Sequence, residues 1–70
     1  MSKETYMIES LTRDLTTRLM EEKNLLMMQA LDIVYTSKTF QDLNNLGTGL
    51  YFQSSVYLFD ILESELNNKQ

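Results

Sequence analysis

The sequence contains no cysteine, no histidine and no proline, and glycine occurs only at Gly47 and Gly49. Without cysteine, the chain can form no disulfide and offers no thiolate to a metal ion. Without histidine or cysteine, the usual nucleophile–base pairs are also missing, so acid–base chemistry would fall to carboxylates, Lys or Tyr. The absence of proline and the scarcity of glycine allow long helices almost everywhere in the chain.

Basic residues are also scarce, because six Lys and Arg stand against ten Asp and Glu, for a formal net charge of -4. Binding to nucleic acid or to an anionic membrane favours clustered basic residues, so we expect neither partner. No apolar run approaches the roughly 20 residues of a membrane span. The start, Met1 to Glu4, has no apolar signal-peptide core, and we therefore expect a cytoplasmic location.

The first segment has the pattern of an ordinary amphipathic helix. Its apolar residues recur at three- and four-residue spacing within an arc of about 120°: Met7, Ile8, Leu11, Leu15 and Leu19. Ser2 can cap this helix, which should end near Glu22. The pattern predicts a single buried stripe.

Two later segments have much wider apolar surfaces, at residues 26–36 and 54–67, with arcs of roughly 220° and 200°. Asn24 and Ser54 are the expected caps of these two helices. We expect the helix at 26–36 to be central, because so apolar a helix needs cover on more than one side. A short helix at 38–44 and a loop at 44–49 separate the two, and residues 50–53 fit either an added turn or an irregular segment.

These patterns predict an all-α fold, a small bundle of three main helices plus one short helix between the second and the last. Residues 1–70 should form a single helical domain. The carboxylates fall mostly on the polar faces of the predicted helices, where solvation is the simplest role. We therefore expect no catalytic residue, no metal site and no bound cofactor.

Apolar and aromatic side chains are concentrated near the end of the chain. These residues fit the core of the domain, but a bundle of three short helices covers one wide apolar helix more easily than two. The remainder would be exposed, and exposed aromatic surface marks a protein-binding or oligomer interface. The candidate interface residues are Tyr51, Phe52, Tyr57, Phe59 and Leu62.

Two separated stretches carry a resemblance to a known family. Residues 30–37 read AL-x-x-VY-x-S, and residues 48–54 read TGLY-x-QS, followed by a tyrosine at 57 and L-x-x-EL at 62–66. This order resembles a family of small, acidic, uncharacterised bacterial proteins, over most of the chain from about Leu11 to Leu66. The family is associated with toxin–antitoxin or mobile-element gene neighbourhoods, so the resemblance implies a partner-binding role.

The function that these observations favour is non-catalytic protein–protein interaction, as a homodimer or as an antitoxin-like subunit that masks a partner protein. Two alternatives remain. A nucleic-acid regulator would use the second and third helices as a helix-turn-helix, although the third carries only Lys38 and Asp42 as charged residues. An accessory subunit of an enzyme would use carboxylates such as Asp32 or Asp42.

Overall fold

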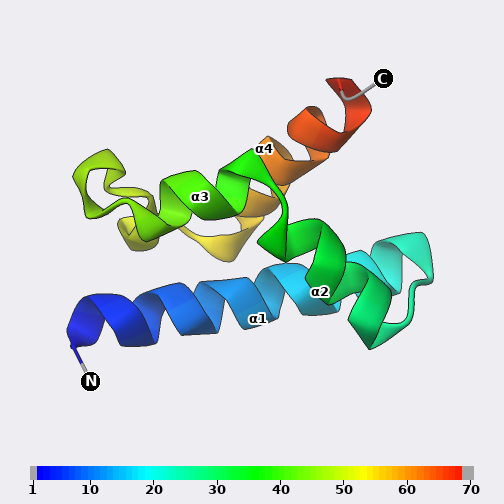
Figure 1. Cartoon of the computed structure of the whole chain (residues 1–70), viewed down its shortest axis with the longest axis horizontal. Coiled ribbons are helices and arrows are strands. Elements are labelled where there is room, and N and C mark those ends of the chain that lie inside the picture. The colour runs from blue at the N-terminus through cyan, green and yellow to red at the C-terminus, as the bar shows by residue number, and fades with distance from the viewer. Residues whose placement is uncertain (1, 69–70) are drawn as a thin grey trace.

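The regular structure of the chain is entirely helical over residues 2–68, which are the residues that the computed structural model describes; Met1, Lys69 and Gln70 lie outside them. The elements are α1 (Lys3–Lys23), α2 (Met27–Tyr35), α3 (Lys38–Asn44), the 3-10 turns η1 (Leu46–Thr48) and η2 (Leu50–Phe52), and α4 (Ser55–Asn68) (Figure 1). The described residues contain no strand, so the all-α prediction is confirmed. The ends predicted for the helices differ from the observed ones by no more than one residue.

Serine side chains cap three of the four α-helices, and two of these caps, Ser2 and Ser54, are the ones predicted above. The hydroxyl oxygens of Ser2, Ser37 and Ser54 accept hydrogen bonds from the backbone N–H three residues later, at 3.1, 3.0 and 3.1 Å. Each bond satisfies a donor that the first turn of a helix otherwise leaves without a partner. The beginnings of α1, α3 and α4 are thus fixed by local sequence.

The start of α2 is organised differently, and Asn24 does not cap it. Asn24 instead ends α1 in the left-handed conformation, with φ 55° and ψ 49°, and its N–H bonds the carbonyl of Met20. Asparagine tolerates this conformation better than most residues. α2 begins after Leu26, whose N–H donates to the side-chain oxygen of Gln29 at 2.9 Å.

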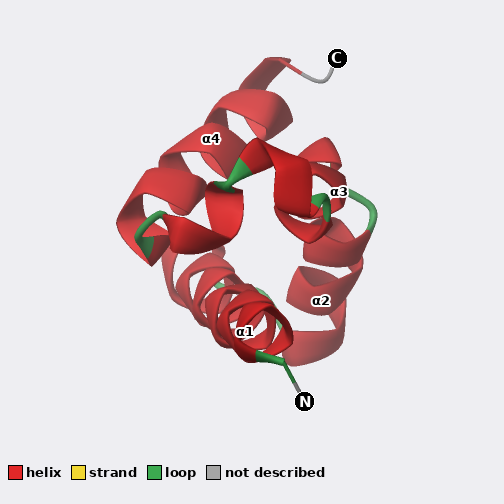
Figure 2. Cartoon of the chain, turned by 90° about the vertical axis from the view of Figure 1, so that its left-hand side faces the viewer, coloured by secondary structure: helices red, strands yellow, loops and turns green. Residues whose placement is uncertain are grey.

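The first helix, rather than the second, is the platform of the fold. α1 contacts α2, α3, α4 and η2, whereas the main contacts of α2 are with α1 and α3. When the molecule is viewed from one end of α1, α2 lies on one side, α4 on the other and α3 between them (Figure 2). The central position expected for the second helix is therefore not observed.

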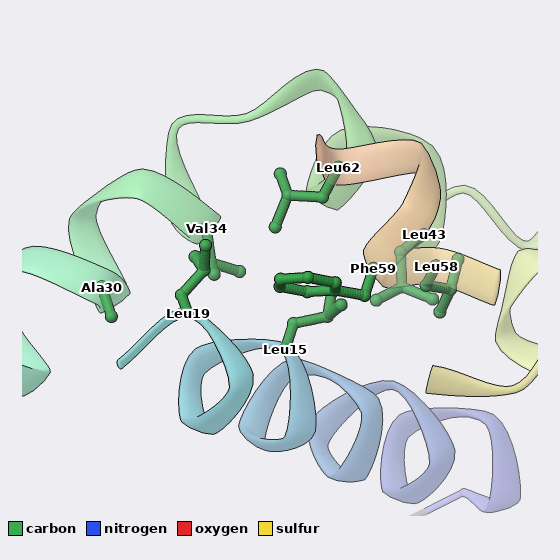
Figure 3. Close-up of a cluster of buried hydrophobic side chains, with 8 residues drawn as sticks. All are labelled: Leu15, Leu19, Ala30, Val34, Leu43, Leu58, Phe59 and Leu62. Atoms are coloured by element: carbon green, nitrogen blue, oxygen red, sulfur yellow. The ribbon is translucent and has the colours of Figure 1, made fainter. Parts of the chain in front are cut away.

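The hydrophobic core lies between α1 and α4 and is closed by residues from α2 and α3. Its buried members are Leu15, Leu19, Ala30, Val34, Leu43, Leu58, Phe59 and Leu62. The ring of Phe59 lies between Leu15 and Leu62 (Figure 3). The guanidinium carbon of Arg18 also lies over the ring, 4.9 Å from its centroid, in a cation–π contact that helps to close the core.

Two carboxylates of α4 hold neighbouring helices in place. Glu63 forms an ion pair with Lys23 at the end of α1, with Nζ and Oε1 3.3 Å apart. Glu65 accepts hydrogen bonds from the backbone N–H groups of Lys38 and Thr39, at 2.8 and 2.9 Å, and from the Thr39 hydroxyl at 2.8 Å. The negative charge of Glu65 therefore meets the positive end of the α3 dipole, so α4 supplies a cap for α3 across the fold.

Replacing this tertiary cap should destabilise the protein. Glu65→Ala removes a charged acceptor from three donors, and we expect a loss of about 2 kcal/mol in the free energy of unfolding. Urea denaturation followed by circular dichroism measures the change. The matched control is Asp60→Ala on the exposed side of α4, which should change stability by less than about 0.5 kcal/mol. Equal losses in the two variants would contradict the capping role.

Candidate functional site: the exposed apolar surface

The five residues predicted as an interface divide between the core and the surface. Phe59 and Leu62 are buried, at 5% and 0% exposure, and neither offers its side chain to a partner in this structure. Phe52 is 70% exposed, Tyr57 is half-exposed, and Tyr51 is partly covered. The wide apolar arc of the last helix is thus mainly buried.

Tyr51 and Phe52 are packed together in η2 and face α1. Their ring centroids are 4.3 Å apart, with a tilt of 32° between the ring planes. With Tyr6, Met7 and Leu11 of α1 they line a shallow hollow of about 190 Å³. Two of the predicted residues therefore form a small aromatic site, joined by the exposed ring of Tyr6, which the sequence pattern did not single out.

The outer face of α2 is exposed, although this helix was predicted to be central. Only Ala30 and Val34 of this helix are fully buried. The residues at and near its start, Leu26, Met27 and Met28, are exposed, and so is Tyr35 at its end. A helix predicted to be central thus presents apolar side chains to solvent at its start and at its end.

One stripe of this face borders a groove against α1. Met27, Leu31 and Tyr35 recur every four residues, so they line one side of α2. Together with Thr12, Thr16 and Met20 of α1 they line a groove of about 190 Å³, here called the α1–α2 groove. Its lining is mostly apolar and follows the direction of both helices.

A second hollow continues the α1–α2 groove toward the start of α1. It has a volume of about 440 Å³ and shares Thr12 and Tyr35 with the groove. Its apolar walls are Ile8 of α1 and the paired rings of Tyr35 and Phe40, which meet edge to face with centroids 5.0 Å apart. The two hollows form a continuous track beside α1, which is mostly apolar in the α1–α2 groove and mixed in the larger hollow, where Thr5, Glu9 and Asn44 also line the wall.

The threonines in this track are less polar than the sequence suggests. The Thr12 hydroxyl donates to the carbonyl of Ile8 at 2.7 Å, and the Thr16 hydroxyl donates to the carbonyl of Thr12 at 2.8 Å. Because the hydroxyl of each is satisfied within α1, its methyl group is available for packing. The apolar stripe predicted from the sequence did not include these threonines, so the groove was not predicted.

Two charged residues, Glu9 and Arg13, line the track. Glu9 lines the larger hollow, and Arg13, one turn later, lines the α1–α2 groove. The ion pairs formed within residues 2–68 are Arg18–Glu22, Lys23–Glu63 and Lys38–Asp42, so neither Glu9 nor Arg13 has an ionic partner there. In the same residues, no cluster of three potential metal-binding side chains occurs.

No protein-family model, curated protein or solved structure matches this chain. None of the helices in the described part of the chain combines the length and the apolar character that crossing a membrane requires. Functional inference therefore depends on the geometry of the surface itself.

Two substitutions separate the buried and exposed parts of the predicted interface. Leu62→Ala leaves a cavity in the core, and we expect it to lower the free energy of unfolding by about 3 kcal/mol. Phe52→Ala removes a larger but exposed side chain and should cost less than about 1 kcal/mol. Urea denaturation of both variants measures the difference. Comparable losses would show that the η2 aromatic pair belongs to the core.

Proposed function

We propose that this protein is a non-catalytic protein–protein interaction module that binds its partner through the α1–α2 groove and the outer face of α2. The observation that carries the proposal is the exposure of Met27, Met28 and Tyr35 beside an apolar groove. A contiguous apolar surface of this kind is typical of interaction sites in soluble proteins.

The physical chemistry of the surface supports binding. Covering apolar surface contributes about 25 cal/mol for each Å² removed from water, and a few hundred Å² would rival the stability of so small a domain. Met20, Met27 and Met28 have flexible, polarisable side chains that adapt to different partner shapes. Tyr35 adds a large ring with a polar tip, a residue type enriched at interfaces.

A groove between two helices suits a third helix as its occupant. An amphipathic helix binds such a groove with apolar residues at three- and four-residue spacing. In this reading α1, α2 and α4 are the three main helices of a bundle, α3 is the short one, and the partner completes the packing around α2. The partner is either a second copy of the chain or, in the antitoxin-like version that the family resemblance implies, a different protein.

The alternatives receive less support from the same surface. α2 and α3 are joined by a short turn, as in a helix-turn-helix, but Lys38 is the one cation of α3 and its Nζ lies 3.1 Å from Asp42. That pairing reduces the positive charge available for phosphate contacts. An accessory role in catalysis would require convergent polar groups, whereas the α1–α2 groove is lined mainly by apolar atoms.

Site-specific photocrosslinking tests the proposed surface. A Met27→benzoylphenylalanine variant places a photoreactive group at the edge of the α1–α2 groove, and the same substitution at Asp60 provides the control on exposed α4. We expect irradiation of the purified protein, alone and with an extract of its source cells, to give a discrete heavier product from position 27. Mass spectrometry then identifies the captured chain.

The control determines how the result is interpreted. Position 60 should give little or no discrete product, because it lies away from the groove. A product of the same identity and yield from both positions would indicate non-specific contact. Absence of a discrete product from position 27, in a variant that retains the helical spectrum, would refute the proposed function.

A further inference from the structure

We infer that the occupant of the α1–α2 groove is a second copy of this chain, packed with its α1 antiparallel to the first α1 across a twofold axis. This inference rests on the proposed function and specifies its partner. It follows from three features of α1: a second stripe on its outer face, the order of charges along that stripe, and the register that those charges impose.

The second stripe consists of Tyr6, Glu9, Arg13, Thr16 and Met20. These residues are spaced alternately three and four apart, which is the spacing of a helix–helix seam. The stripe is distinct from the core stripe that contains Leu15 and Leu19. Tyr6 is 64% exposed and Glu9 and Arg13 are exposed, whereas Met20 is partly covered and Thr16 is 6% exposed, so the stripe is open to a partner from Tyr6 to Arg13.

The charge order on this stripe is self-complementary. In a twofold interface, if residue i contacts residue j of the partner, then j also contacts i. An axis between Glu9 and Arg13 therefore brings each glutamate opposite the arginine of the other copy and forms two equivalent ion pairs. Neither residue has an ionic partner within residues 2–68, so both side chains are available.

The same register places the remaining members of the stripe. Tyr6 and Thr16 are as far from the axis as each other, so the Tyr6 ring of one copy lies opposite Thr16 of the other. Thr16 lines the α1–α2 groove beside Met20 and Met27. The exposed ring thus enters an apolar groove whose nearest threonine hydroxyl is already bonded within its own helix.

The area required is compatible with the size of the protein. The surface of the described chain is 4807 Å², and a standard interface covers about 800 Å² on each partner. α1 spans about 31 Å at 1.5 Å per residue. The register overlaps most of that length, and the outer face of α2 adds Met27 and Tyr35 along the flank.

Charge reversal tests the register directly. Glu9→Arg makes every residue pair at the axis positive, and Arg13→Glu makes every pair negative. Each single variant should weaken the dimer by about tenfold or more, because like charges meet twice. The double variant Glu9→Arg/Arg13→Glu restores opposite charges and should return the dissociation constant to within about threefold of the original, since the order is only reversed.

An equimolar mixture of the two single variants provides a second test. One chain then has two positive positions and the other has two negative positions, so the mixed dimer forms both ion pairs. Sedimentation velocity over a concentration series should show dimer in the mixture at concentrations where each variant alone is monomeric. The control Asp14→Arg makes the same change in net charge as Glu9→Arg on another side of α1 and should leave the dimer unchanged.

The outcomes distinguish this inference from the proposed function. A monomeric wild-type chain that crosslinks to a different protein through position 27 overturns the twofold dimer but supports the interaction role. A wild-type dimer that is insensitive to both charge reversals overturns the register. Urea denaturation of each variant checks that it is folded, and a folded single variant that dimerises as strongly as the wild type also overturns the inference.

Discussion

The packing of α4 against α1 is the constraint on which the rest of the structure depends. Phe59 and Leu62 of α4 lie above Leu15, and Leu58 of the same helix lies beside Leu43 (Figure 3). Arg18 covers the enclosed Phe59 ring, and α2 adds Ala30 and Val34 to the buried core, with Ile33 packed against it and partly buried.

The exposed apolar surface of α2 lies outside this core. Because α2 reaches the core through two small or medium side chains, its methionines and Tyr35 remain outside. Thr12 and Thr16 of α1 are compatible with this packing, because their hydroxyls donate to carbonyls of their own helix and their methyl groups face α2. The α1–α2 groove and the stripe through Glu9 and Arg13 are thus neighbouring parts of the surface of α1.

Local signals accounted for most of the secondary structure. The serine caps and the apolar spacings act within a few residues, so Ser2, Ser37 and Ser54 could be assigned from sequence. Asn24 could not, because asparagine suits both a helix start and a left-handed helix end, and the direction in which the chain turns decides between them. The cap that Glu65 provides for α3 joins residues 26 and 27 positions apart, beyond any local pattern.

The sequence alone determined that the chain is helical, where its helices begin and end, and that two helices carry more apolar surface than one partner covers. Only the tertiary structure decided which of the two is enclosed. Hydrophobic periodicity shows how much of a helix is apolar, but it does not show which of two apolar helices is buried in the core. That choice depends on the fit of whole side chains in three dimensions, and here Phe59 and Leu62 fit inside while the outer face of α2 does not.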